Sequence, residues 1–139
     1  MCVTMHGTGH EPQVQSATEV MQRAYAPYSQ FRVGATLVAA DGTEFHGCNV
    51  ENSSYPAGIC AERSALSAAV AAGHRRFSLL VVATEATEPT PPCGICRQAL
   101  VEFEPQLQII SATLDGRRVS WRLSELLPVP FTPASLAHR

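Results

Sequence analysis

The sequence predicts an α/β fold: a single three-layer domain in which a mixed five-stranded sheet is flanked by helices. Two pairs of β-rich segments, each joined by Asp-Gly, and helix-like segments around a short apolar strand predict it. The chain has 139 residues, 45% apolar and 16% charged, which fits one globular domain. We expect residues 1–13 to form a flexible tail and residues 14–139 the domain.

The first elements are a helix and a hairpin. Residues 14–24 carry apolar side chains at helical spacing, and Pro27 lies just beyond them. Residues 31–40 and 43–50 are β-rich and flank Asp41-Gly42, which is a strong hairpin signal. A helix followed by two antiparallel strands is therefore expected.

The middle of the chain predicts two helices around a buried strand. Residues 60–72 are rich in Ala and end at Gly73, which is typical of a helix and its C-cap. Residues 79–84 form a continuous apolar run, the pattern of a strand buried on both faces. After a proline-rich loop, residues 93–103 are again helix-like.

A second hairpin is expected near the end of the chain. Residues 107–114 and 117–123 flank Asp115-Gly116, and residues 124–127 resemble a short helical turn. Asp41 and Asp115 are the two aspartates of the sequence, and both fall in turns. Any acid–base carboxylate must then be a Glu.

Composition and charge exclude several classes of protein. All ten basic residues are Arg, so no Schiff-base or P-loop lysine exists. The formal net charge of −2 argues against a nucleic-acid partner. Residues 1–15 lack the pattern of a secretory signal, and the longest apolar stretch, 65–72, is too short to span a membrane. We expect a cytoplasmic protein without a membrane partner.

Three of the five cysteines are candidate zinc ligands. Cys93 and Cys96 form a C-x-x-C unit at an expected helix start, and Cys60 begins another helix. Helix N-termini favour the thiolate, which is the form that binds zinc. Cys2 lies in the tail, and Cys48 fits a small buried side chain better. Three ligands are the number found in catalytic zinc sites, in which water takes the fourth position.

Charged neighbours of these cysteines suit a catalytic site. Glu62 would stand beside the metal as a base without being a thiolate ligand. Three thiolates leave zinc and its ligands with a formal charge of −1, so a cation bonded to the sulfurs would help. Arg63 is the favoured candidate for this cation and Arg97 is the second.

Several separated motifs resemble the small homotetrameric cytidine deaminases, which depend on zinc. Cys-Ala-Glu at residues 60–62 and Pro-Cys-Gly-Ile-Cys at residues 92–96 are similar to the zinc deaminase signature. The resemblance covers about residues 14–136 and rests on AYAPYSQFRVGA (24–35), GCNVEN (47–52), CAER (60–63), PCGICRQ (92–98) and ELLP (125–128) before Phe131.

The resemblance implies a cytidine deaminase, a hydrolase that converts cytidine and deoxycytidine to uridine and deoxyuridine with release of ammonia, in pyrimidine salvage. It implies one Zn²⁺ per subunit, held by Cys60, Cys93 and Cys96. Glu62 would take a proton from the attacking water and deliver protons to ring N3 and the leaving amino group. Arg63 would hydrogen-bond the thiolates.

The resemblance also implies substrate contacts and a homotetramer with shared active sites. Phe31 would stack on the base, and Asn49 and Glu51 would bind the ribose hydroxyls. Residues that would complete a neighbour's site are Ser53, Tyr55 and Phe131. Without the resemblance, Phe31 would be explained as a core aromatic, and Asn49 and Glu51 as strand-end residues.

Three alternatives remain. A deaminase of a cytosine nucleoside antibiotic such as blasticidin S shares the zinc motifs, although Asn49 and Glu51 favour an ordinary ribose. A structural zinc module would need a fourth protein ligand and no Glu62. A nucleic-acid editor is disfavoured by the net charge and by Cys60, where such enzymes usually carry His.

Overall fold

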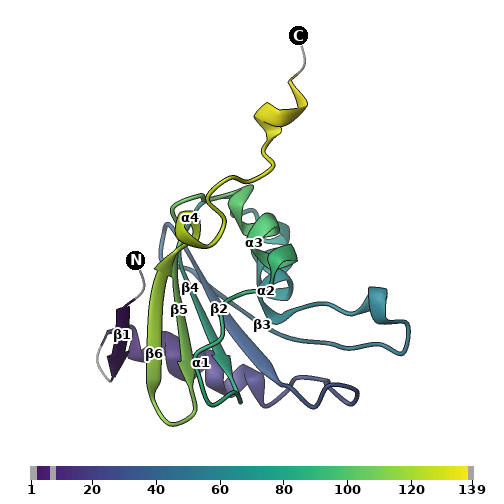
Figure 1. Cartoon of the computed structure of the whole chain (residues 1–139), viewed down its shortest axis with the longest axis vertical. Helices are drawn as coiled ribbons and strands as arrows, with labels where there is room; N and C mark the ends of the chain where they lie inside the picture. Colours follow the sequence, from purple (N-terminus) through teal and green to yellow (C-terminus); the bar gives the residue numbers. More distant parts are fainter. Residues whose placement is uncertain (1–2, 7–8, 138–139) are drawn as a thin grey trace.

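The computed structural model describes residues 3–6 and 9–137 and shows three layers (Figure 1). A six-stranded mixed sheet, ordered β1-β6-β5-β4-β2-β3, forms the middle layer. Helix α1 packs on one face of the sheet, and α2 and α3 lie side by side over the other. The predicted α/β class and the five expected strands are confirmed.

The strands pair antiparallel except β4 and β5, which are parallel. Their bounds are β1 Val3–His6, β2 Val33–Ala39, β3 Glu44–Cys48, β4 Phe77–Thr84, β5 Gln108–Thr113 and β6 Arg117–Arg122. The helices are α1 Glu11–Met21, α2 Ala61–Ala71, α3 Gly94–Val101 and α4 Leu123–Leu126, with 3₁₀ turns η1 Tyr55–Ala57 and η2 Pro133–Leu136.

The sixth strand, β1, comes from the segment that the sequence predicts as a tail. It pairs with β6, and α1 then begins at Glu11 rather than near residue 14. Pro12 lies in the first turn of α1, where its missing N–H breaks no helical hydrogen bond. Arg118 of β6 fixes this start, because its Nη1 lies 2.5 Å from Glu11 Oε2 and 3.2 Å from the Gly9 carbonyl oxygen. The flexibility of residues 1–13 stays a prediction.

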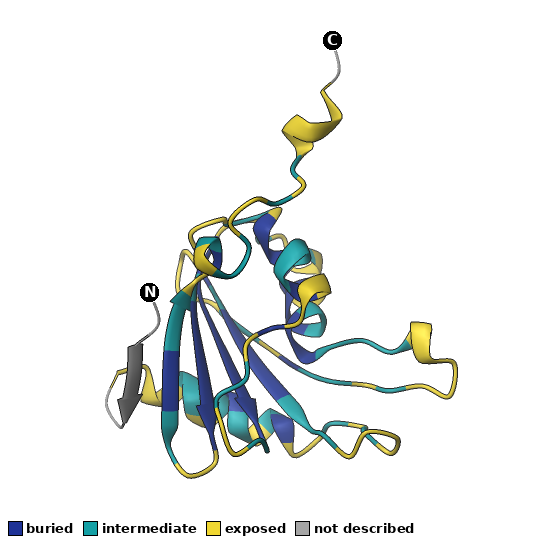
Figure 2. Cartoon of the chain, viewed as in Figure 1, coloured by how far each residue is buried: buried dark blue, intermediate teal, exposed yellow. Residues whose placement is uncertain are grey.

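Strand β4 carries apolar side chains into both cores, as its continuous apolar run predicts. Leu79 and Val81 pack towards α1, whereas Leu80 and Val82 pack towards α2 and α3. Figure 2 shows the buried residues concentrated in the central strands and on the inner sides of the helices. The core therefore fixes α2 and α3, the two helices that begin at the candidate cysteines.

Gly47 lets α2 approach the sheet closely. A Cβ atom at Gly47 would lie 2.5 Å from the Ala61 carbonyl oxygen and 2.5 Å from the Ala65 amide nitrogen. On the other face, a Cβ at Gly34 would lie 1.9 Å from the Ala17 carbonyl oxygen of α1. Both positions need Gly because the helix backbone occupies the space of a side chain.

Two arms extend from the sheet beside each other, residues 22–32 and residues 49–60 (Figure 1). The Tyr25 N–H donates to the Asn49 carbonyl at 3.0 Å, and the Glu51 N–H donates to the Tyr25 carbonyl at 2.8 Å. The residues after α4 extend away from the body and are largely exposed (Figure 2). The arm of residues 49–60 leads directly into α2 at Cys60, so the arms adjoin the candidate site, whereas the C-terminal segment extends in another direction (Figure 1).

Candidate active site

Helices α2 and α3 bring the three predicted ligands together. Cys60 is the N-cap of α2, Cys93 is the N-cap of α3, and Cys96 lies one turn into α3. Their three sulfurs lie within 4.8 Å of one another, and Cys60 Sγ is 3.7 Å from Cys93 Sγ. Two sulfurs of a tetrahedral zinc site with bonds of about 2.3 Å lie roughly 3.8 Å apart. The cluster therefore fits Zn²⁺, and its three members match a catalytic site.

The thiols share a negative charge that one cation stabilises. Hydrogen bonds to the Cys60 sulfur lower the pKa of that thiol to about 5. The largest contribution comes from the Cys96 thiol, and the next from Arg63. The pKa of Cys96 is raised, because its thiol hydrogen-bonds Cys60 and is buried. Zinc binding must displace the protons that remain on the thiols, so zinc affinity rises with pH.

Glu62 is a carboxyl group buried in the wall of the site, in the first turn of α2. Only 5% of Glu62 is exposed, and this burial raises the pKa of its carboxyl to about 7, with the nearby Cys60 thiolate adding to the effect. A carboxyl group with a pKa near 7 can both accept and donate a proton at neutral pH. This is the behaviour expected of a group that moves protons during a reaction.

The two candidate arginines have different partners. Arg63 Nη2 donates to Cys60 Sγ at 3.7 Å, as expected of the cation that offsets the thiolate charge. Arg97 instead donates through Nε to the Pro92 carbonyl at 2.8 Å and through Nη1 to the Leu126 carbonyl at 3.0 Å. Arg97 therefore joins the loop before Cys93 to the end of α4 and is not bonded to a sulfur.

A cavity of about 530 Å³ opens beside the cysteines. This volume lies in the range of small-molecule sites, roughly 300–1,000 Å³. Among the residues that line it are the predicted site residues Phe31, Asn49, Glu51, Tyr55, Cys60, Glu62 and Cys93. The structure thus places two of the three expected zinc ligands, Glu62 and four of the expected substrate contacts around one space.

The Asn49 side chain is hydrogen-bonded to the backbone of Phe31 and Val33. Its Oδ1 accepts the Val33 N–H at 2.8 Å, and its Nδ2 donates to the Phe31 carbonyl at 2.8 Å. The two bonds use one of the two amide N–H donors and one of the two oxygen lone pairs, so one N–H and one lone pair remain for a ligand. Asn49 therefore fixes the backbone of Phe31 and Val33 while facing the cavity.

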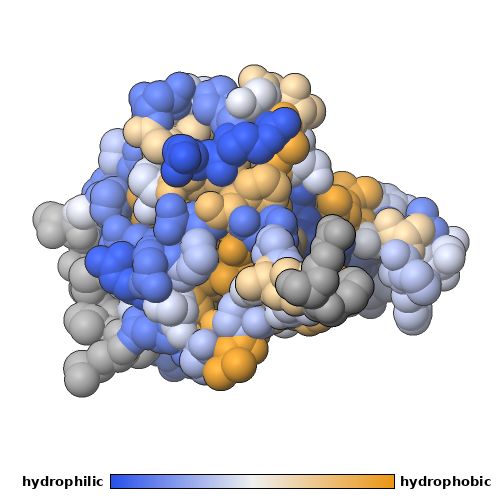
Figure 3. Space-filling model, turned by 90° about the horizontal axis from the view of Figure 1, so that it is seen from above, coloured by the Kyte–Doolittle hydropathy of each residue, from blue (hydrophilic) through white to orange (hydrophobic). Residues whose placement is uncertain are grey.

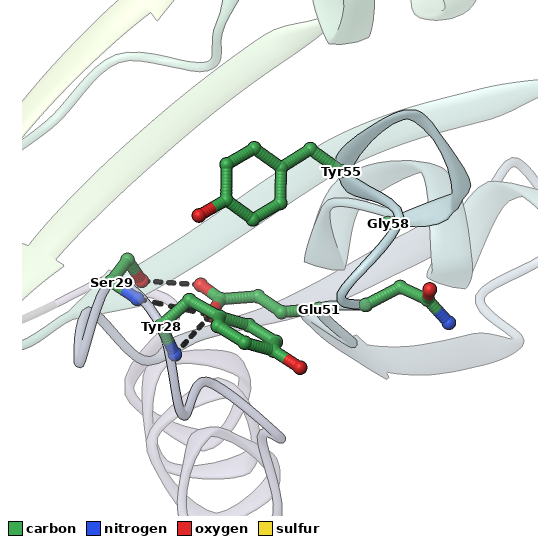
Figure 4. A pocket seen from close by; sticks show the side chains of 6 residues that line it. Tyr28, Ser29, Glu51, Tyr55 and Gly58 are labelled. Carbon is green, nitrogen blue, oxygen red and sulfur yellow. Dashed lines mark hydrogen bonds between the residues drawn. The ribbon is translucent and has the colours of Figure 1, made fainter.

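A second hollow of about 370 Å³ adjoins the first between the two arms (Figure 4). Glu51 lies between the hollows and accepts hydrogen bonds from Tyr28 and Ser29. Tyr28 and Tyr55 meet edge to face across this hollow, with their ring centroids 6.0 Å apart. Tyr55 therefore lines a hollow of the chain to which it belongs, and it is 75% exposed in the single chain.

Two predicted substrate contacts do not line the cavity of their own chain. Ser53 is exposed in the arm of residues 49–60. Phe131 is 58% exposed, and its carbonyl accepts the Gln98 Nε2–H at 2.8 Å. The sequence did not indicate that Ser29 and Thr90 line the cavity, although Ser29 lies in the motif that contains Phe31.

A family model described as the cytidine and deoxycytidylate deaminase zinc-binding region matches residues 8–112. The chain belongs to this deaminase family. Zn²⁺ is the cofactor of the family, and the cluster of Cys60, Cys93 and Cys96 is one that could hold it. No described helix of this deaminase combines the length and the apolar character needed to cross a membrane.

Curated relatives and solved structures agree with this family. The cytidine deaminase of Sporosarcina psychrophila is 40% identical over 129 residues, 92% of this chain and 95% of the relative. The cytidine deaminase of Halalkalibacterium halodurans is 40% identical over 120 residues, 86% of this chain and 91% of the relative. The crystal structure of cytidine deaminase from Burkholderia pseudomallei superposes with a TM-score of 0.85 at 43% identity, covering 89% of this chain and all of that one.

Proposed function

We propose that this chain catalyses the hydrolytic deamination of cytidine and deoxycytidine to uridine and deoxyuridine, with release of ammonia, in pyrimidine salvage. The observation that carries the proposal is the buried Glu62 carboxyl in the wall of a cavity that also contains two of the three clustered thiols, Cys60 and Cys93. The family membership and the curated cytidine deaminases at 40% identity support the same substrate class.

Cys60, Cys93 and Cys96 hold one Zn²⁺ per subunit. When bound, zinc activates a water molecule for attack by lowering its pKa. Arg63 offsets part of the thiolate charge through its contact with Cys60, which keeps the site from becoming too electron-rich.

Glu62 moves the protons of the reaction. Its carboxylate takes one proton from the attacking water and delivers it to N3 of the cytosine ring as the C–O bond forms at C4. It then passes the second proton to the amino nitrogen on C4, and the C–N bond breaks to release ammonia. Both protons of the water are thus accounted for, one on N3 of the product and one on ammonia.

The nucleoside contacts come from residues that line the cavity. Phe31 stacks on the base, while Asn49 and Glu51 bind the sugar hydroxyls through their remaining acceptor and donor positions. A ligand without sugar hydroxyls would leave these polar groups of the site unpaired, so the site discriminates against such a ligand. This arrangement favours an ordinary nucleoside over a modified one.

We further propose a cytoplasmic homotetramer in which neighbours complete each other's sites through Ser53, Tyr55 and Phe131. Several large apolar side chains are exposed in the single chain, among them Val129, Phe131 and Leu136 of the C-terminal segment. Figure 3 looks onto this end of the molecule and shows apolar patches between hydrophilic ones. Burial of such side chains between subunits would stabilise the assembly.

The proposal is tested by product analysis. Purified protein is incubated with cytidine, deoxycytidine and blasticidin S, singly and in competition, and the products are separated by chromatography. Equal amounts of uridine and ammonia from cytidine are expected, and cytidine should outcompete blasticidin S. Absence of ammonia with either ordinary nucleoside would refute the proposed reaction.

A further inference from the structure

We propose that Ser29 is a positioning residue for the nucleoside sugar: its hydroxyl orients the Glu51 carboxylate and joins it to the backbone of Phe31. The inference rests on the proposed function, because it assigns Ser29 to the sugar end of the same cavity. Ser29 lines both hollows and stands between the residues proposed to contact the sugar and the base.

The Glu51 carboxylate is held by three donors from one turn (Figure 4). Its Oε1 accepts the Tyr28 N–H at 3.0 Å and the Ser29 N–H at 3.1 Å, and its Oε2 accepts the Ser29 hydroxyl. A carboxylate offers about four acceptor positions, two on each oxygen. Oε1 is therefore filled, and Oε2 keeps one position for a ligand hydroxyl beside that of Ser29.

The Ser29 hydroxyl also accepts a hydrogen bond from the Phe31 N–H at 3.0 Å. A hydroxyl has a single proton to donate, and this one is committed to Glu51. One side chain thus joins the two residues proposed to bind the two halves of a nucleoside. The distance between the base-stacking ring and the sugar-binding carboxylate depends on this link.

The two arms hold Ser29 and Glu51 in place from both sides. Gln30 has a left-handed φ of 56°, and its N–H donates to the Ala26 carbonyl at 3.0 Å, which closes the turn that contains Ser29. The Glu51 N–H donates to the Tyr25 carbonyl at 2.8 Å. Loss of the Ser29 hydroxyl would leave these backbone bonds intact but would free Oε2, so the carboxylate could turn away from the sugar.

The same contacts keep Glu51 ionised. Hydrogen bonds from the Ser29 hydroxyl, the Ser29 N–H and the Tyr28 N–H lower the pKa of the Glu51 carboxyl. An anionic acceptor binds a hydroxyl more strongly than a neutral one does. The geometry and the charge therefore both suit recognition of a sugar hydroxyl.

The test compares Ser29→Ala, Ser29→Thr and the control Ser16→Ala on cytidine and on 3′-deoxycytidine, which lacks the 3′-hydroxyl. Ser16 is a half-buried serine whose hydroxyl is also bonded, but that hydroxyl donates to the Pro12 carbonyl in α1. Ser29→Ala should lower kcat/KM for cytidine about tenfold, mainly through KM, as expected for loss of a hydrogen bond to a charged group. It should change kcat/KM for 3′-deoxycytidine little, and Ser29→Thr should restore the cytidine value.

Equal losses on the two substrates, or no loss on either, would overturn the role of Ser29. An inactive wild-type protein would instead refute the proposed function itself, so the two failures are distinguishable. Affinity for uridine, measured by calorimetry, gives a readout independent of turnover and should fall in Ser29→Ala alone. If Ser29→Ala does not fold, Ser29→Cys, with a weak donor of similar size, replaces it in the same comparison.

Discussion

Glu62 combines two properties that rarely occur together, an ionisable carboxyl and near-complete burial. Glu62→Gln keeps the size and shape of the side chain but removes the proton acceptor. Deamination should slow by about 10²–10⁴, the usual contribution of general acid–base catalysis. Turnover is measured together with zinc content and thermal unfolding, and the latter two should match the wild type.

Glu19→Gln is the matched control, because it makes the same change at an exposed residue of α1, on the other face of the sheet from the site. It should leave the rate unaltered. Near-normal turnover by Glu62→Gln would remove Glu62 from the mechanism.

Arg63 and Arg97 test whether a cation must contact the zinc thiolates. Arg63→Ala removes the donor to Cys60, so zinc affinity should fall, and the rate of zinc loss to a chelator should rise. Arg97→Ala removes bonds to the Pro92 and Leu126 carbonyls and should lower the melting temperature more than the zinc affinity. Equal, negligible effects on zinc loss would contradict the charge-offsetting role of Arg63.

At the level of elements, the close approach of α2 to β3 positions Cys60, the N-cap of α2. Gly47→Ala would force its Cβ against the backbone of Ala61 and Ala65, which lie in the first two turns of α2 after Cys60. Overpacking of this kind typically costs about 1–3 kcal/mol. We therefore expect both a lower melting temperature and a weaker zinc site.

Gly34→Ala is the matched comparison, because it forces a Cβ against α1 on the opposite face of the sheet. It should destabilise the fold while zinc affinity in the folded protein stays near the wild-type value. Comparable zinc loss in the two variants would show that α2 placement does not control the site. Calorimetry and zinc titration give the two readouts.

Local patterns predicted the hairpins and most helices because the turn residues act over a few positions. Asp41-Gly42 and Asp115-Gly116 join the expected strand pairs, and both glycines have the positive φ that these turns require. The cysteine cluster could be predicted since helix starts and the C-x-x-C spacing are visible in the sequence. The start of α1 could not, because it depends on the contacts of Arg118 in β6 with Glu11 and the Gly9 carbonyl, which join distant parts of the chain.

Contacts between distant segments escaped prediction. Arg97 donates to carbonyls in a loop and at the end of α4, and the sequence does not reveal these partners. From the sequence, Arg97 and Arg63 could be compared only by how near each lies to a cysteine. The bonds from Ser29 to Glu51 join positions 22 residues apart. Such pairs depend on how the arms fold beside each other, which no periodic pattern encodes.

At the scale of the whole molecule, the exposed arms and C-terminal segment are the parts of the chain that the proposed tetramer would use to share sites. If Phe131 completes a neighbour's site, subunits with different defects should compensate for each other. Co-expressed Glu62→Gln and Phe131→Ala chains should form mixed tetramers with more activity than the two separate variants together. Light scattering should show four chains per particle.

The control pairs Glu62→Gln with Cys93→Ser, since both changes disable the same part of a subunit's own site. This pair should restore nothing. Activity that only adds, or a monomeric particle, would contradict shared sites.

A zinc titration of cytidine turnover tests whether the deamination depends on one Zn²⁺ bound by each subunit. Protein freed of metal with a chelator is given Zn²⁺ in steps, and loss of the cytosine absorbance is followed at each step. Activity should be absent without zinc, rise linearly, and level off at one Zn²⁺ per subunit, as the single cluster of Cys60, Cys93 and Cys96 in the described chain requires. Full turnover without zinc, or no turnover with one zinc bound per subunit, would contradict the account.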